Sequence, residues 1–301
     1  MRTRERNGTI MIRFALPDLI RSLELNLTIA GMMKSAPEMF YDDVSLSSLY
    51  GCFPGCSMNG GRIMDGVPYS YDRIAETFDR ISEAGLGVRL TFTNMFVRPE
   101  HFEDEYSNQI LKAAQGHQTE VIVYSDELGE YIAEHYHFRR ILSTTRKLNG
   151  VEELNAMLGR YDMVVLDYNH NKDDLFLGQV SDPTRLEVMP NEACVPGCPF
   201  RQQHYEHDSR CQLENRFDVF RCPNTGCAGP GYTSRAEESR TILSNDDIRR
   251  LNTTYGISDF KIVGRRGALE FILEAYLYYL VRPEYRNTVG KILGRQLRPQ
   301  S

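Results

Sequence analysis

The stretch EVIVYSDELGEYIAEHYHFRRILS, residues 120–143, contains a complete strand–helix–strand unit. The β-branched, apolar run at 120–124 is typical of a buried strand, and the run at 138–143 has the same character. Between them Ser125 can cap a helix, whose apolar positions recur at helical spacing. These positions are Leu128, Tyr131 and Ile132. A strand, a helix and a second strand in this order predict two parallel strands joined by a crossover helix.

The same alternation recurs along the whole chain. Strand candidates lie at 10–16, 44–50, 88–93, 120–124, 138–143, 162–167, 185–189 and 260–263. Helix-compatible segments stand between several of them, and one begins with the capping residue Ser244. Eight strands that alternate with helices are what a closed barrel requires. The sequence therefore predicts an α/β fold, a TIM-type (β/α)8 barrel that forms a single domain over residues 1–301.

The composition is that of an ordinary water-compatible domain. Of 301 residues, 41% are hydrophobic and 25% are charged, and 41 acidic against 35 basic side chains give a net charge of -6. This acidic balance argues against bulk nucleic-acid binding and leaves open a local patch such as Arg249-Arg250 with Arg265-Arg266. No long apolar run follows the basic start, so we expect neither a signal peptide nor membrane contact, and a cytoplasmic protein.

Five of the seven cysteines cluster at 191–243. This segment is rich in proline and glycine and interrupts the alternation of strands and helices before the last strand. The five cysteines are Cys194, Cys198, Cys211, Cys222 and Cys227. Clustered cysteines in a reducing compartment are more often metal ligands than disulfides. Their irregular gaps favour an iron–sulfur cluster of the 4Fe–4S type, with zinc as the alternative. Arg201 occupies the third position of a CxxxCxxC triplet, so the standard radical-SAM motif is absent.

A cubane cluster takes four thiolates, so five cysteines leave one in reserve. We expect Cys227 to be the reserve and the other four to bind the metal, although Cys222 and Cys227 are close enough in sequence to exchange roles. Cys52 and Cys56 lie far upstream in a separate glycine-containing loop and are not expected to be ligands.

Two motifs in the last third of the chain resemble the peptidase U32-like proteins. The first is NEACVPGCPFR at residues 191–201, and the second is GISDFKIVGR at residues 256–265. The resemblance implies a barrel that carries a four-cysteine iron–sulfur cluster. It further implies oxygen-independent hydroxylation of quinone precursors or RNA bases, or else proteolysis. The cysteine spacing and the compact length depart from the family pattern, so the substrate does not carry over.

Polar residues at predicted strand ends are the candidates for substrate and cofactor binding, because barrel sites are built from the loops that follow the strands. The substrate candidates are Arg62, Asn94, Asp167, Asn191 and, beside the cysteines, His204. The cofactor candidates are Asn59, Lys261 and Arg265. Lys261 alternates with the apolar Phe260 and Ile262, so we expect it to point into the barrel.

Together these features predict an iron–sulfur-dependent enzyme that acts on a small polar or anionic molecule. Both redox chemistry, served by a redox partner, and Lewis-acid chemistry on an open iron site stay open at this point, and the resemblance adds an oxygen-independent hydroxylase to the redox alternatives. One alternative is a metal-assisted hydrolase, for which the sequence has no GxSxG or HExxH motif. The other is a non-catalytic binding protein with a structural zinc or iron–sulfur site.

Overall fold

The computed structural model describes residues 4–5, 9–61, 66–224, 226, 227, 229, 231–264 and 269–296. Eight strands form a closed barrel in the order β10-β3-β4-β5-β6-β7-β8-β9, and the recorded pairings between them are parallel. The strands are β3 Ile12–Pro17, β4 Val44–Gly51, β5 Gly87–Phe92, β6 Thr119–Val123, β7 Arg139–Leu142, β8 Met163–Val165, β9 Leu186–Val188 and β10 Asp259–Lys261. Each overlaps one of the eight predicted strands, so the predicted barrel is confirmed. The short β1 Arg4–Glu5 and β2 Thr9–Ile10 pair separately.

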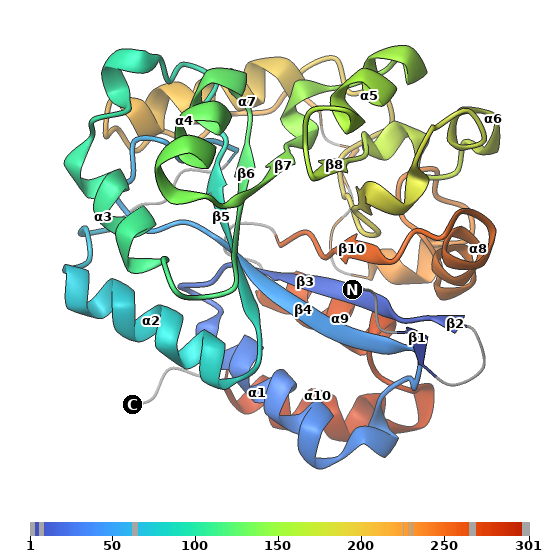
Figure 1. Cartoon of the computed structure of the whole chain (residues 1–301). Helices are drawn as coiled ribbons and strands as arrows, with labels where there is room; N and C mark the ends of the chain where they lie inside the picture. Colours follow the sequence, from blue (N-terminus) through green and yellow to red (C-terminus); the bar gives the residue numbers. More distant parts are fainter. Residues whose placement is uncertain are drawn as a thin grey trace. The chain divides into compact units, whose positions relative to one another are not determined.

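Helices alternate with the barrel strands along the chain, as Figure 1 shows by colour. They are α1 Leu23–Ser35, α2 Tyr71–Glu83, α3 Glu105–Ala113, α4 Asp126–Tyr136, α5 Val151–Leu158, α6 Asp174–Leu177, α7 Arg201–Leu213, α8 Asn245–Tyr255, α9 Leu269–Tyr279 and α10 Arg286–Gln296. Two predicted caps are confirmed. The Ser125 hydroxyl accepts the Leu128 N–H at the start of α4 (3.3 Å), and Ser244 accepts the Asp247 N–H at the start of α8 (3.1 Å). Within the described ranges, no helix combines the length and the apolarity that a membrane crossing requires.

By its internal contacts the chain divides into two compact units, one of which comprises Ser48–Val165 and Cys198–Thr225. Its strands β5, β6 and β7 pair in register, with Glu120 opposite both Arg89 and Arg139. Gly129 of α4 lies directly over Val123, so the odd-numbered residues of β6 face the helix layer. Glu120 and Ile122 therefore face the barrel interior. Helices α2 and α3 of this unit lie side by side (Figure 1).

The other unit comprises Met1–Ser47, Leu166–Gly197 and Gly226–Ser301. In it the Phe14 ring contacts the rings of Phe260 in β10 (5.8 Å) and Tyr279 in α9 (6.1 Å). These strand residues therefore face the helix layer. Lys261, which alternates with Phe260, lies on the opposite face of β10, as predicted. Helices α1 and α10 pack against each other (Figure 1).

The cysteine-rich segment at 191–243 is less irregular than its sequence suggests. Thirteen of its residues form α7, and four form the 3-10 helix η6 Tyr232–Arg235. Between them, residues 214–224 have neither helix nor strand. Asn191 and Ile242 form an isolated antiparallel bridge, so the two ends of the segment meet.

Candidate functional site at the carboxyl ends of the strands

A cluster of buried amides follows β4 and β5 in the unit that contains α7. The Asn94 amide nitrogen donates to the carbonyl oxygens of Ser57 (2.9 Å), Asn59 (3.1 Å) and Ser209 (2.9 Å). Its oxygen accepts the Phe96 N–H at 2.9 Å. Asn94 is 0% exposed, and its side-chain nitrogen and oxygen are both engaged within the protein. It holds α7, which contains Ser209, against the loops after β4 and β5.

Asn59 is part of the same cluster. Its amide nitrogen donates to the Gln212 side chain of α7 (3.3 Å), and its oxygen accepts the hydroxyl of Thr91 in β5 (3.0 Å). The following Gly60 packs so closely on the next loop that an added Cβ would lie 2.2 Å from the Thr93 carbonyl oxygen. No side chain fits there. The predicted cofactor residue Asn59 thus lies in the packed support beneath α7.

The start of α7 is anchored to the loop after β7. Arg201 is 5% exposed and donates to the Thr144 carbonyl (3.1 Å) and hydroxyl (2.9 Å). Its guanidinium also donates to the Tyr205 hydroxyl at 2.9 Å and lies over that ring. The two ends of α7 are therefore fixed on carboxyl-end loops of β4, β5 and β7, where barrel enzymes place their active sites.

In the other unit, residues after β8 hold the turn that contains the first cysteine pair. Asp167 is 2% exposed and accepts the backbone N–H (3.0 Å) and the amide (2.8 Å) of Asn169. The Asn169 oxygen then accepts the Gly197 N–H at 2.8 Å, and the Tyr168 hydroxyl donates to the Val195 carbonyl at 3.3 Å. The predicted substrate residue Asp167 thus orients the residue that fixes the Cys194–Cys198 turn.

Asn191 ties the end of β9 to the end of β10. Its amide nitrogen donates to the Val263 carbonyl (2.9 Å) and to the Tyr232 hydroxyl (3.2 Å), and its oxygen accepts the Val263 N–H (2.7 Å). Burial raises the pKa of Tyr232 above its usual range, so this phenol is a neutral partner. Asn191 is 0% exposed. Lys261 is 9% exposed on the interior face of β10, while Arg62 and Arg265 lie outside the described residues.

Four of the five clustered cysteines, all except Cys211, are partly exposed and lie in loops. The Cys198 sulfur is 3.8 Å from the amide nitrogen of Asn224, so the segment that contains Cys222 returns to Cys198. Cys211 is different, because it is buried in α7 with its sulfur 3.5 Å from His207 Nε2. Thiolates are the right donors for iron or zinc. Over the described residues, no three histidine, cysteine or carboxylate side chains are placed to share one ion.

His204 lies on α7, and its side chain is 47% exposed. Its ring stacks on Phe220 at 5.0 Å, and its Nε2 is 3.5 Å from the carboxylate of Asp208, one turn further along. Asp208 is buried, so its carboxylate is held in place and can orient the imidazole. The arrangement presents the His204 imidazole beside the cysteine segment.

The sequence missed Ser209, Gln212 and Tyr232 as partners of the strand-end asparagines. The stretch RQQHYEHDSRCQL has no apolar stripe, because its buried residues are mostly polar. Hydrophobic periodicity therefore could not indicate which face of α7 is covered. The one signal in the sequence is that this predominantly polar helix has no apolar face, which indicates that a polar surface receives it.

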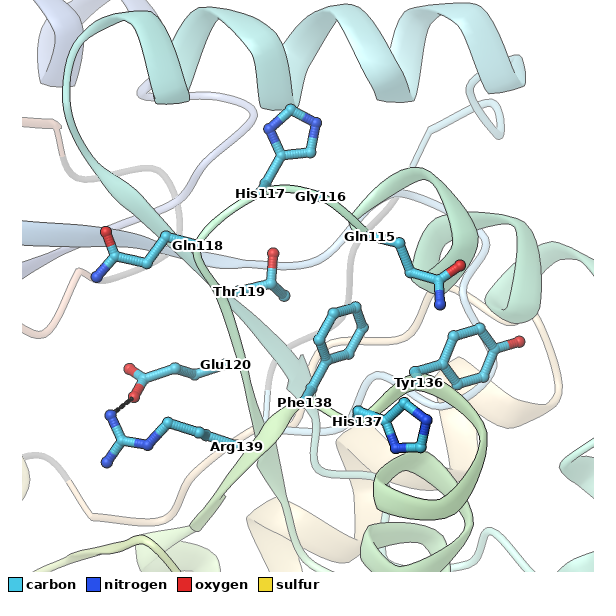
Figure 2. A pocket seen from close by; sticks show the side chains of 10 residues that line it. All are labelled: Gln115, Gly116, His117, Gln118, Thr119, Glu120, Tyr136, His137, Phe138 and Arg139. Atoms are coloured by element: carbon cyan, nitrogen blue, oxygen red, sulfur yellow. Dashed lines mark hydrogen bonds and ion pairs between the residues drawn. The ribbon is translucent and has the colours of Figure 1, made fainter.

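A pocket of about 430 Å³ lies at the other end of the strands, around the amino ends of β6 and β7. Figure 2 shows Phe138 and Tyr136 on one side and the ion pair between Glu120 and Arg139 (2.8 Å) on the other. Because the amino end of a TIM barrel generally supports stability and the carboxyl end catalysis, this pocket is not the candidate active site.

No family model matches the chain, and a search of curated proteins finds no relative. Among solved structures, a U32 peptidase aligns with a TM-score of 0.54 at 14% identity, over 87% of this chain and 96% of that chain. A xylose isomerase domain containing protein from Salmonella typhimurium (10% identity, TM-score 0.43) covers 97% of this chain and 100% of its own. The Bacillus cereus spore cortex-lytic enzyme SleL (10%, 0.33) covers 91% and 76%. The fold is thus U32-like; at this identity the likeness shows the fold alone.

Proposed function

We propose that the chain is a barrel enzyme whose cysteine-rich segment binds an iron–sulfur cluster and acts on a small polar or anionic molecule. The observation that supports this best is the anchoring of that segment. Gly197 is held by Asn169 in one unit, and Ser209 is held by Asn94 in the other. In both cases a strand-end amide of the barrel holds the segment at the carboxyl ends of strands, which is where barrel enzymes act.

The exposure of the thiols guides the choice of ligands. Cys194, Cys198, Cys222 and Cys227 are partly exposed and lie in loops outside any regular helix or strand. Cys211 is buried against His207 within a regular helix. We therefore favour Cys227 over Cys211 as the fourth ligand, which departs from the expectation from spacing alone. When bound, the cluster supplies electron transfer or an iron Lewis acid, and His204, oriented by Asp208, holds a proton beside the cysteine segment.

Hydrolysis through a cysteine nucleophile has weaker support, although a thiol and an imidazole do meet on α7. Burial raises the pKa of Cys211, and the carboxylates of Asp218 and Asp208 raise it further, against the opposing charge of Arg216. A buried thiol with a raised pKa is a poor nucleophile. The pair of Cys211 and His207 therefore lacks the activation that a cysteine hydrolase needs.

A serine series tests both the cluster and its ligands. Each of the five cysteines is replaced singly, and the proteins are purified without oxygen and assayed for iron, sulfide and zinc. Cys194→Ser, Cys198→Ser, Cys222→Ser and Cys227→Ser should each lose most of the iron, whereas Cys211→Ser should keep it. Iron that survives both Cys194→Ser and Cys198→Ser would refute the assignment. Zinc in place of iron throughout would favour the structural-site alternative.

A further inference from the structure

Cys52 and Cys56, which the proposed cluster does not use, form a buried thiol pair in the loop after β4. Cys52 is 1% exposed and Cys56 is 0% exposed. The two thiols are hydrogen-bonded to each other. Both residues lie in the same tight turn, in which the Cys56 N–H donates to the Phe53 carbonyl at 3.3 Å. Two thiols in hydrogen-bond contact within one short turn are near neighbours, as a disulfide requires.

The surroundings of the two sulfurs differ in a way that assigns them different roles. The Cys56 sulfur is 3.3 Å from the Ser107 hydroxyl, which lies in the first turn of α3. The Cys56 sulfur also accepts hydrogen bonds from the backbone N–H groups of Met58 and Asn59. Burial alone would raise the pKa of Cys56, but the hydrogen bonds from Cys52, Ser107 and these two N–H groups outweigh it and lower the pKa.

Cys52 has the opposite environment. Burial raises the pKa of Cys52, and the neighbouring Cys56 raises it further, while one N–H group, from Phe53, opposes the rise. The pair therefore consists of one sulfur with several hydrogen-bond donors that favour its thiolate and one sulfur with a single such N–H group. This division between an attacking and a resolving thiol is what a two-step oxidation requires.

We propose that Cys52 and Cys56 are a peroxide-reactive dithiol that closes to an intramolecular disulfide. The Cys56 thiolate attacks one oxygen of the hydroperoxide, the O–O bond breaks, and the other oxygen leaves as hydroxide or alkoxide, which takes up a proton. The resulting Cys56 sulfenic acid is attacked by the Cys52 sulfur, the S–S bond forms, and water leaves with the Cys52 proton. The two thiols lose two electrons, and the peroxide gains them. A cellular dithiol reverses the reaction by exchange.

The same turn continues into the support of α7. The Asn59 N–H donates to the Cys56 carbonyl at 3.3 Å, and Asn94 holds the carbonyls of Ser57 and Asn59. Closing a disulfide at Cys56 therefore perturbs the backbone on which α7 rests. The inference uses no residue of the proposed cluster, so its failure leaves the proposed function untouched.

The sequence offers a direct measurement. Trypsin cuts after Lys34 and Arg62, and the peptide 35–62 contains Cys52 and Cys56 and no other cysteine. The anaerobic protein is treated with hydrogen peroxide, denatured in an alkylating reagent and digested. The peptide should lose the mass of two hydrogen atoms and take up no reagent, and prior treatment with a dithiol should restore two alkylations. Two alkylated cysteines after peroxide, or a Cys56 sulfinic acid beside an alkylated Cys52, would overturn the proposal.

Three variants test the assigned roles. Cys52→Ser should accumulate a sulfenic acid at Cys56 that a dimedone probe traps, whereas Cys56→Ser should leave Cys52 unlabelled. Ser107→Ala removes one donor to the thiolate and should slow disulfide formation several-fold without preventing it. Labelling of Cys52 in place of Cys56 would contradict the assignment. The measurement on the wild-type protein does not depend on the folding of any variant, so it tests disulfide formation by itself.

Discussion

The side-chain amide of Asn94 donates to the carbonyl of Ser209 across 2.9 Å and thereby joins the loop after β5 to the middle of α7. A polar helix with no apolar stripe gains little from hydrophobic burial. Its position depends on such bonds, and the two amide N–H groups of Asn94 lie within hydrogen-bond distance of three carbonyls. The helix that carries His204 and Cys211 is therefore fixed by buried polar groups of the barrel.

Asn94→Ala should lower the free energy of unfolding by about 2–4 kcal/mol, because it leaves buried carbonyls without their donor. Urea denaturation measures this loss. The matched control is Asn287→Ala on the exposed face of α10, which should change the stability by less than about 0.5 kcal/mol. Equal effects of the two substitutions would show that the Asn94 bonds contribute nothing to the fold.

Two glycine-to-alanine substitutions distinguish the effect of close packing from the effect of helix propensity. Gly60→Ala would place a methyl group 2.2 Å from the Thr93 carbonyl oxygen, so we expect a loss of about 3 kcal/mol. Gly31→Ala in α1 meets nothing within 4 Å and should stabilise the protein by about 0.5–1 kcal/mol. The two substitutions should change the free energy of unfolding in opposite directions in the same urea assay. A Gly60→Ala variant as stable as the wild type would contradict the close approach of Gly60 to Thr93.

The interior charges at the amino end of the barrel should matter more than those on the surface. Glu120 contacts Arg89 at 2.7 Å and Arg139 at 2.8 Å, and the Arg89 side chain is only 4% exposed. Glu120→Gln should cost about 3 kcal/mol, because it removes the carboxylate from a buried guanidinium. The control Asp174→Asn breaks an exposed pair with Arg250 and should cost less than about 1 kcal/mol.

Acid should weaken the protein partly through Asp126. Burial raises the pKa of Asp126, but the hydrogen bond from Tyr161 and the charges of Arg146 and Arg160 outweigh this and lower it. The native state thus binds this proton less readily than the unfolded chain. The carboxylate stabilises the protein at neutral pH, and this contribution is lost as the pH falls below the ordinary aspartate pKa of about 4.

The stability difference between wild type and Asp126→Asn should therefore be largest near neutral pH and shrink on acidification. Tyr161→Phe removes the strongest of the lowering interactions and should move this loss of stability to higher pH. A difference that stays constant from pH 7 to pH 3 would mean that the carboxylate titrates alike in the native and unfolded states.

The fold could be read from the sequence because the predicted strands are short runs rich in apolar and β-branched residues, and because Ser125 and Ser244 mark where two of the helices begin. The candidate site could be read only in part. Asn94, Asp167 and Asn191 were found from their positions after strands, but position does not reveal what an amide contacts. Their partners are backbone groups of Ser209, Asn169 and Val263, which leave no mark in the side-chain pattern. The spacing of the cysteines likewise does not indicate which of them is buried, so the burial of Cys211 could not be predicted.

The central claim is that the cysteine-rich segment holds an iron–sulfur cluster, and the metal content of the wild-type protein tests it most directly. The protein is expressed with iron and cysteine available, purified without oxygen, and assayed together for iron, acid-labile sulfide and zinc. The account predicts about four iron and four sulfide per chain, with the broad brown absorbance of a cubane cluster. Stoichiometric zinc without sulfide, or a metal-free protein that is fully folded, would contradict it.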